Sequence, residues 1–384
     1  MIKLFKLTAF VMMCMLLLPP LEGGACTSAI ISADANPYGR PILWKHRDTS
    51  TIDNKVEFVS SNPGELSYVA LFNSKDKALK EAWMGMNEAG FAVMNTASYN
   101  IKDDKVSSKK MDKEGIVMTK ALKTCRTVDD FARLLETLPR PMGVEANFGV
   151  IDALGNGAYF ETNNHSYKRY DLKDAENGVL IRTNYSMSGR PNEGYGFVRY
   201  ESACHLLEPY IKTKSVTPEV LTEEVSRSFY HSWKNRDYAV TGDKWVIDQD
   251  FIPRFKSTAT CAIEGCRPVK SLKDVNPDFI RREYVMWTGL GYPPCAETRG
   301  VTCSPDGVDD EMRGSLPNGH APLADRAKKM RAEVFPVTKG NGEKYIDMEV
   351  LVGKGGDGKG YIRQMKEKSL ENYRKVRQRR DGNR

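Results

Sequence analysis

The sequence of 384 residues has one long hydrophobic run, Leu7 to Leu18, and no second run long enough to cross a membrane. It has no G-x-x-x-x-G-K-[ST] loop of the kind that cradles nucleotide phosphates, and no internal repeat of the solenoid type. It has only five histidines, and no two cysteines have the C-x₂-C spacing of many zinc sites. These absences argue against a P-loop enzyme, a repeat protein and a structural zinc domain, and we expect neither a cofactor nor a metal.

The composition is 40% hydrophobic and 28% charged, as is typical of a soluble globular protein. The formal net charge is +7, and residues 354–384, with 11 Lys and Arg against 4 Asp and Glu, account for all of it. Apolar residues in this segment recur at helical spacing, which predicts an amphipathic terminal helix. We interpret its charge as a solvated helix face and expect no nucleic-acid partner.

Residues 1–25 have the parts of a secretory signal peptide: a positive start, the apolar run, and the small residues Gly23 and Ala25 before Cys26. This predicts cleavage before Cys26, export to a periplasmic or extracellular location, and no stable membrane insertion after the signal is removed. Two alternatives stay open, namely a lipid-anchored binding protein with an acylated Cys26 and no catalysis, and a leader retained as an anchor. The remainder divides into one domain, 26–353, and a basic helical tail, 354–384.

Seven cysteines follow the leader, and an exported protein meets an oxidising compartment. If Cys26 stays free, the other six can form three disulfide bridges, in a connectivity that the sequence does not settle. Short spacings favour the local pairs Cys261 with Cys266 and Cys295 with Cys303.

Alternating apolar patterns between turn residues predict antiparallel hairpins, with helices grouped between the sets of strands. The predicted strands are 27–33, 41–45, 55–60, 67–72, 81–86, 91–95, 146–153, 157–162, 166–171, 179–183, 257–264 and 283–291. The predicted helices are 111–138, about 196–212, one that begins at Thr217, and the terminal helix. Thr127 and Asp130 have the spacing of a capping box. Segregated helices and antiparallel strands indicate an α+β fold in layers.

Cleavage before Cys26 would place a thiol and a free α-amine on the same residue. An α-amine titrates at about 7.7–8.0, far below a lysine, so near neutral pH it can accept the thiol proton. Thiolate is the reactive form of cysteine. Cys26 would then be nucleophile and general base together, and no separate catalytic histidine would be required.

Four segments, in order, resemble the cysteine-type N-terminal-nucleophile (Ntn) hydrolases. The stretch CTSAIISADANPYGRPILWKHRD (26–48) is similar to the start of that family, where Cys-Thr opens a strand and the return strand ends in a basic-x-x-Asp sequence. GMNEAGFAVMN (85–95), NFGVIDALGNGAYFET (147–162) and GVLIRTNYS (178–186) resemble later segments. The chain most resembles the isopenicillin-N acyltransferase-like hydrolases of linear amides; choloylglycine hydrolases and penicillin V acylases are more distant relatives.

The resemblance implies a four-layer αββα sandwich with Cys26 at the end of a central strand. It implies an amidohydrolase for linear, non-peptide C–N bonds that works through a Cys26 thioester, with acyl transfer as a second fate of that thioester. Asp48 matches the carboxylate that orients the α-amine. Asn184 matches a donor to the developing oxyanion, and Asn95 a second donor or substrate contact.

Three residues are predicted to contact the substrate: Lys45, His46 and Arg199. Lys45 and His46 stand where the family commonly has an Arg-Asn pair, and on a strand only one of the two can face the site. Arg199 resembles a helix-borne arginine of some relatives. The expected partner is a small-molecule amide; the sequence leaves its identity and the oligomeric state open.

Overall fold

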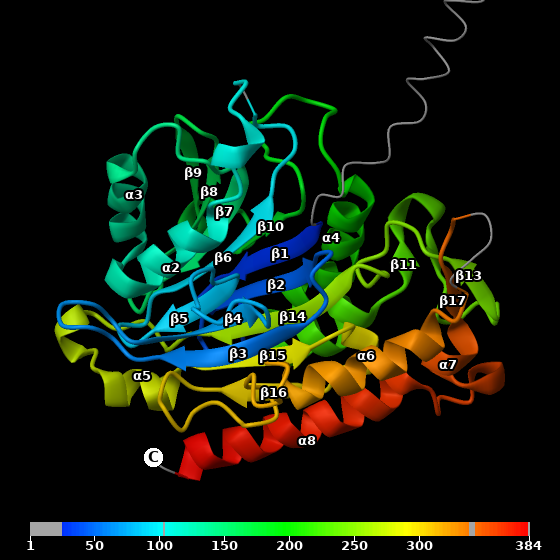
Figure 1. The fold of residues 1–384 in the computed structure, drawn as a ribbon. Helices are drawn as coiled ribbons and strands as arrows, with labels where there is room; N and C mark the ends of the chain where they lie inside the picture. Colours follow the sequence, from blue (N-terminus) through cyan, green and yellow to red (C-terminus); the bar gives the residue numbers. More distant parts are fainter. Residues whose placement is uncertain (1–24, 103, 338–341, 383–384) are drawn as a thin grey trace, which may run out of the picture.

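The computed structural model describes residues 25–102, 104–337 and 342–382, and two antiparallel sheets form its centre (Figure 1). One sheet has six strands in the order β10-β1-β2-β14-β15-β16, and the other has seven strands, β3 to β9, in chain order. The predicted signal peptide lies outside the described residues except for Ala25.

The strands have the following bounds. The six-stranded sheet contains β1 (Cys26–Ile31), β2 (Ile42–Asp48), β10 (Val179–Arg182), β14 (Ser257–Glu264), β15 (Val285–Leu290) and β16 (Thr298–Val301). The seven-stranded sheet contains β3 (Asn54–Val59), β4 (Tyr68–Asn73), β5 (Met84–Asn87), β6 (Ala92–Ala97), β7 (Ala146–Ile151), β8 (Gly157–Thr162) and β9 (Tyr167–Asp171). Two small ribbons pair β11 (Tyr230–His231) with β12 (Arg236–Asp237) and β13 (Trp245–Ile247) with β17 (Tyr345–Asp347).

Helices cover the outer face of each sheet (Figure 1). The described helices have the bounds α2 (Glu114–Thr124), α3 (Val128–Thr137), α4 (Phe197–Lys212), α5 (Pro277–Glu283), α6 (Pro322–Val334), α7 (Met348–Val352) and α8 (Tyr361–Gly382). Helices α2 and α3 lie on the seven-stranded sheet, and α4 and α8 on the six-stranded sheet. No helix within the described ranges combines the length and hydrophobicity that a membrane crossing needs.

Three buried apolar clusters fill the spaces between these layers. Alternate residues of a strand face opposite sides of its sheet, so each sheet contributes side chains to a cluster on each of its faces. Between the two sheets, Leu43 of β2 packs in the same cluster as Met94 of β6. Outside the seven-stranded sheet, Phe131 of α3 packs over β7 and β8. Outside the six-stranded sheet, Trp44 and Trp287 pack under α4 and α8. The order of layers is therefore αββα, which confirms the predicted fold class.

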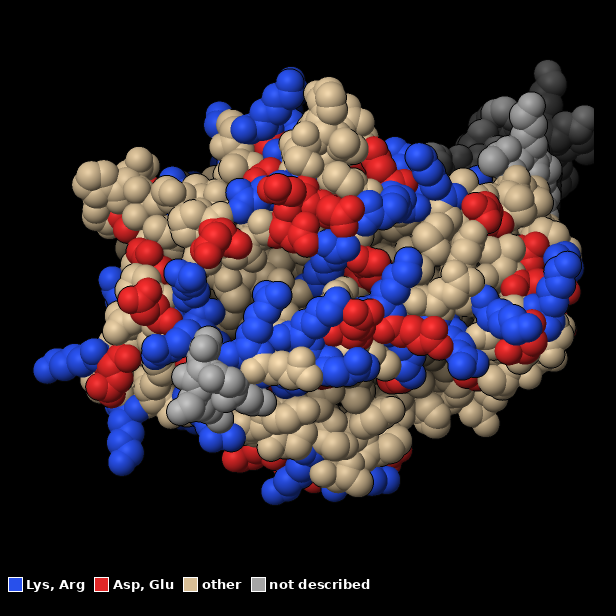
Figure 2. Space-filling view, turned by 90° about the horizontal axis from the view of Figure 1, so that it is seen from below, with Lys and Arg blue, Asp and Glu red and all other residues tan. Residues whose placement is uncertain are grey.

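The amphipathic helix predicted for the basic segment is present as α8, and it lies along β16 and α7 at the bottom of Figure 1. Tyr373 of α8 is 2% exposed and stacks on Trp287 of β15, with ring centroids 3.9 Å apart. On this face blue and red side chains are interspersed (Figure 2), and Arg380 pairs with the buried Glu264 at 3.1 Å. The helix is thus part of the outer layer and is solvated on one side only. The predicted domain boundary at residue 353 stays a prediction.

Most predicted strands are present within a residue or two of their predicted bounds. The helical region predicted for 111–138 is two helices, which break at residues 125–127 where the Thr127–Asp130 capping box starts α3. Helices α5 and α6 and the two ribbons were not predicted; they lie among loops whose sequences carry no long periodic pattern.

The predicted disulfides are wrong for this structure: all seven described cysteines are free. Cys261 lies in β14, where its thiol donates to the Thr288 hydroxyl, and Cys266 lies two residues beyond the end of β14, where its thiol donates to the Ala153 carbonyl. Cys295 and Cys303 are buried in different clusters. The buried cysteines fill the cores as small apolar side chains.

Candidate active site

Cys26 is the first residue of β1, which pairs with β10 on one side and with β2 on the other. The register places Cys26 opposite Arg47 of β2. Leu43 faces the space between the sheets and Trp44 faces the helices, so Arg47, which has the parity of Leu43, shares the inner side with Cys26. The local pattern of β2 therefore brings a cation across from the cysteine.

The backbone of Cys26 is held by two side chains. Its N–H donates to Oδ1 of Asn184 at 2.9 Å, and its carbonyl accepts from Nη1 of Arg199 at 2.6 Å. Nη2 of Arg199 also donates to Oδ1 of Asn184 at 2.9 Å, and the amide nitrogen of Asn184 donates to the carbonyl of Ala97. Asn184 therefore turns its oxygen toward the nitrogen that cleavage would convert into an α-amine.

Asp48 ends β2 beside the cysteine, and its backbone carbonyl accepts from the Cys26 thiol at 3.9 Å. Its carboxylate accepts from Nε and Nη2 of Arg254, at 3.0 and 2.9 Å, and from the Ser257 hydroxyl at 2.7 Å. Burial alone would raise the pKa of Asp48, but the charge of Arg254 and the nearby His46 outweigh it and lower the pKa to about 2. Asp48 is therefore an anion at all physiological pH values.

Lys45, two residues before Arg47 on the same face of β2, is 2% exposed. Its Nζ donates to Oδ1 of Asn95 at 2.8 Å and to the carbonyl of Trp83 at 3.0 Å. Burial lowers the pKa of Lys45 to about 8, although the nearby Cys26 side chain opposes the shift. Because Lys45 holds the oxygen of Asn95, the N–H groups are the part of that amide left for a substrate oxygen.

Arg47 is a second buried cation, with its guanidinium 5.0 Å from the ring centroid of Trp83. It donates to the amide oxygens of Asn54 and Asn73. Burial lowers the pKa of Arg47 to about 10. Within the described part of the chain neither Lys45 nor Arg47 forms an ion pair with a carboxylate.

A cavity of about 710 Å³ opens onto these groups. Its lining includes Cys26, Lys45, Arg47, Asp48, Trp83 and Asn95. The acidic residues Asp112, Glu114 and Glu145 also line it. Burial raises the pKa of Glu114 to about 7, although the Glu145 backbone N–H donates to that carboxylate and opposes the shift. The cavity lining thus combines two buried cations near the cysteine with a group of acidic residues and Lys102, which pairs with Glu145 at 3.6 Å.

The structure brings the four predicted catalytic residues together. Cys26, Asp48 and Asn95 line the cavity, and Asn184 contacts Cys26 from behind. The contact seen for Asn184 is made by its oxygen to the Cys26 nitrogen, so its oxyanion role stays a prediction. Likewise, Asp48 contacts the Cys26 thiol through its carbonyl, and the role of its carboxylate toward the amine stays a prediction.

Of the three predicted substrate contacts, only Lys45 lines the cavity. His46 is 0% exposed and faces the helix side, where Nε2 lies 2.8 Å from the Ser257 hydroxyl. Arg199 is also 0% exposed and holds Cys26 from behind. The geometry therefore gives His46 and Arg199 supporting places behind the strand ends, away from the cavity.

Sequence reasoning missed Arg254 and Asp250, which lie in the loop between β13 and β14. Asp48 and Arg254 are 206 residues apart, and no periodic pattern marks the loop. The available signal was one of position: Arg254 comes shortly before the predicted strand 257–264, which pairs with β2. Arg47 was also missed, although it stands in the quoted motif and alternates with His46.

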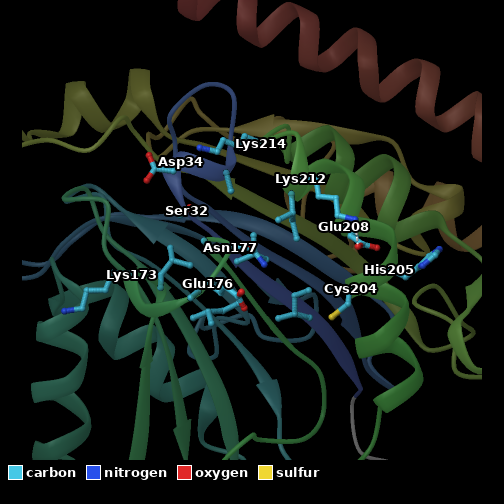
Figure 3. Close-up of a pocket in the computed structure, with 18 of the residues that line it drawn as sticks. Ser32, Asp34, Lys173, Glu176, Asn177, Cys204, His205, Glu208, Lys212 and Lys214 are labelled. Atoms are coloured by element: carbon cyan, nitrogen blue, oxygen red, sulfur yellow. Dashed lines mark hydrogen bonds and ion pairs between the residues drawn. The ribbon is translucent and has the colours of Figure 1, made fainter.

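A larger cavity, of about 970 Å³, lies beside α4 and the segment that leads into β10 (Figure 3). Cys204 and His205 of α4 line it, but consecutive residues of a helix project about 100° apart. Burial raises the pKa of the Cys204 thiol, and His205 stacks on Tyr230 with ring centroids 4.3 Å apart. The smaller cavity at Cys26 is therefore the candidate active site.

An αββα sandwich that opens a central strand with a cysteine, its nitrogen held by an asparagine, defines the architecture of an Ntn hydrolase. The family model "Acyl-coenzyme A:6-aminopenicillanic acid acyl-transferase" matches residues 44–238, just over half of the chain. The chain belongs to this acyl-transferase family. Among curated proteins no significant match was found.

Solved structures give weak similarities. An N-acylethanolamine-hydrolyzing acid amidase ortholog from Caenorhabditis elegans has a TM-score of 0.43 and 13% identity, and the match covers 66% of this chain and 97% of that one. A mutant conjugated bile acid hydrolase from Clostridium perfringens has a TM-score of 0.42, 11% identity, and coverage of 74% and 95%. Penicillin V acylase from Agrobacterium tumefaciens has a TM-score of 0.40, 12% identity, and coverage of 72% and 86%. The fold assignment rests on the sheets and layers described above.

Proposed function

We propose that this protein is an exported thiol amidohydrolase that cleaves a linear, non-peptide amide through Cys26 once residues 1–25 have been removed. One observation carries the proposal: Cys26 lines a cavity, and the side chains of Asn184 and Arg199 hold its backbone nitrogen and its carbonyl. Family membership agrees with chemistry at an acyl carbon. Export is proposed from the leader sequence alone.

In the first step the α-amine takes the thiol proton, and the thiolate attacks the amide carbonyl carbon. The tetrahedral intermediate then collapses, the C–N bond breaks, and the amine leaves with the proton held by the α-ammonium. A thioester on Cys26 remains. Water, deprotonated by the α-amine, attacks the thioester and releases the acid together with the restored thiol. A second amine in place of water would give acyl transfer.

Negative charge develops on the carbonyl oxygen in each half-reaction. The N–H groups of Asn95, oriented by Lys45, are the donors that line the cavity beside Cys26, and we assign them to this oxygen. Loss of one such donor commonly lowers kcat by about 10²- to 10³-fold. The buried charges of Lys45 and Arg47 favour the same oxyanion.

The same two cations favour a substrate that carries a carboxylate. Two buried positive charges without a carboxylate partner are unfavourable in the free enzyme, and a bound anion removes that penalty. We therefore propose that an N-acylglycine is hydrolysed faster than the matched N-acylglycinamide, which lacks only the charge.

The proposal is tested with three purified forms of the protein: one that begins at Cys26, one that begins at Ala25, and the Cys26→Ala variant of the first. Amine release from a panel of N-acyl amides is measured, with thermal unfolding as the check on folding. We expect turnover only by the form that begins at Cys26, because an added residue converts the α-amine into a peptide nitrogen. Full activity of the folded form with the extra residue would show that the α-amine is not the base.

Intact mass of the natural mature protein tests the processing itself. A mass that begins at Cys26 without modification is expected. Acyl chains on Cys26 would instead identify a lipid-anchored binding protein.

A further inference from the structure

We propose that Asp250 is a positioning residue of the active site. It holds Arg199 and Arg254 in the orientations in which Arg199 contacts Cys26 and Arg254 contacts Asp48. The inference rests on the proposed function and assigns a role to a residue in the loop between β13 and β14. Asp250 is not one of the cavity-lining residues.

The carboxylate of Asp250 contacts two arginines. Oδ1 of Asp250 accepts from Nε of Arg199 at 2.8 Å and from Nη1 of Arg254 at 2.8 Å. Arg199 comes from α4 and Arg254 from the loop before β14, so a single carboxylate oxygen joins two separate elements. Its side chain is 30% exposed, whereas Arg199 is fully buried.

The other edges of the two guanidinium groups contact residues of the active site. Arg199 reaches the Cys26 carbonyl and Oδ1 of Asn184, and Arg254 reaches the Asp48 carboxylate twice. A guanidinium is a rigid planar fork, so fixing one edge orients the other. Asp250 therefore links Arg199, which contacts the Asn184 that holds the Cys26 nitrogen, to Arg254, which contacts Asp48.

Asp250 also offsets the repulsion between the two arginines. Burial lowers the pKa of Arg199 and the nearby charge of Arg254 lowers it further, while Asp250 opposes both effects. Arg199 is fully buried and the side chain of Arg254 is 19% exposed. The two cations repel each other, and Asp250 supplies a shared counter-charge. Asp248 does not replace it, because its Oδ2 accepts from the Phe255 N–H and burial raises the pKa of Asp248 to about 7.

The test uses the form that begins at Cys26 and two substitutions. Asp250→Asn keeps an oxygen that can accept from both arginines but removes the charge, and Asp250→Ala removes both. We expect kcat to fall on the order of 10-fold for Asn and 100-fold for Ala, since small misplacements of reacting groups have effects of this size. KM should change less than twofold, because Asp250 does not line the cavity. The control Asp243→Asn, an exposed partner of Arg236, should leave both constants unchanged.

If Asp250 only stabilised the fold, its substitution would lower thermal stability and leave the pH profile of Cys26 reactivity unchanged. We therefore also measure the rate of Cys26 alkylation by iodoacetamide against pH, and expect both Asp250 variants to shift this profile while the Asp243→Asn profile stays in place. An unchanged kcat and alkylation profile in Asp250→Ala would overturn the proposal. So would a loss of activity that follows thermal unfolding, with the profile unmoved.

The two proposals can fail separately. If the unsubstituted form turns over no amide of the panel, the proposed function fails. The alkylation profile still decides whether Asp250 positions Cys26, because that reaction needs no substrate.

Discussion

The side chain of Lys45 combines two opposed properties at the scale of one residue. It lines the cavity and contacts Asn95, yet it carries a charge in a buried place without a carboxylate partner. Groups of this kind commonly favour function over stability. The balance can be measured directly by removing the charge.

We predict that Lys45→Met raises the free energy of unfolding at pH 7 by on the order of 1–3 kcal/mol while it lowers amide turnover. The folded-state pKa of Lys45 is about 8, below the ordinary value of 10.5. The unfolded state therefore binds more protons between these values, and the stability of the unsubstituted protein should rise with pH across that window. Urea unfolding at several pH values measures both effects.

The rise between pH 8 and 10.5 should be smaller in Lys45→Met, because this residue no longer contributes to it. The exposed Lys77 provides a control, since Lys77→Met should leave the urea midpoint unchanged. A Lys45→Met variant that is less stable than the unsubstituted protein at pH 7 would contradict the buried-charge account.

Asp48 makes the opposite contribution. Its pKa is about 2 in the folded protein against an ordinary 3.8, so its stabilising effect is present above about pH 4 and is lost as the pH falls toward 2. We predict that Asp48→Asn is less stable by about 2 kcal/mol at pH 7. The loss of stability toward pH 2 should also be shallower in the variant.

Urea midpoints from pH 2 to 7 measure this difference, with Asp310→Asn on the surface as the control. Equal acid sensitivity of Asp48→Asn and the unsubstituted protein would show that Arg254 does not hold Asp48 as described.

At the scale of elements, α8 is the part whose position differs most from the sequence-based expectation. Its periodicity predicted a helix, but periodicity does not tell which surface receives the apolar side. Trp287, in β15, is that surface, and it stacks on Tyr373. The helix therefore closes the outer layer of the six-stranded sheet.

We predict that Tyr373→Ala lowers the free energy of unfolding by about 3–5 kcal/mol, as expected when a large buried aromatic side chain is removed. Leu370→Ala, three residues away on the same helix and 37% exposed, should have a much smaller effect. Chemical unfolding of the two variants tests this. Equal effects would mean that α8 does not depend on the Tyr373–Trp287 contact.

At the scale of the whole molecule, hairpin patterning was sufficient to predict an α+β fold in layers, because alternation along each strand encodes which face is buried. The four-layer αββα order was implied by the resemblance to the Ntn hydrolases. Cys26, Asp48, Asn95 and Asn184 could be selected because they stand within segments that resemble those of a known family. The disulfides could not, since spacing along the chain does not give the distance between two thiols: Cys295 and Cys303 are buried in different clusters, and Cys261 and Cys266 share a cluster without being bonded.

Arg254 and Asp250 were missed for a related reason. Arg254 contacts Asp48 across 206 residues of sequence, and Asp250 contacts Arg199 across 51. Both lie in an irregular loop, where neither period nor motif marks a side chain. Only the pairing of β14 with β2 brings this loop beside Asp48. Partners of this kind become visible when the strand order is known.

The central claim is that the sulfur of Cys26 carries the acyl group during turnover. The most direct measurement is rapid acid quenching of the form that begins at Cys26 while it hydrolyses a cleavable amide, followed by peptide mass mapping. We predict an added acyl mass on the peptide that begins at Cys26, sensitive to hydroxylamine and absent without substrate. Turnover with that peptide unmodified, or with the acyl group on another residue, would contradict the account.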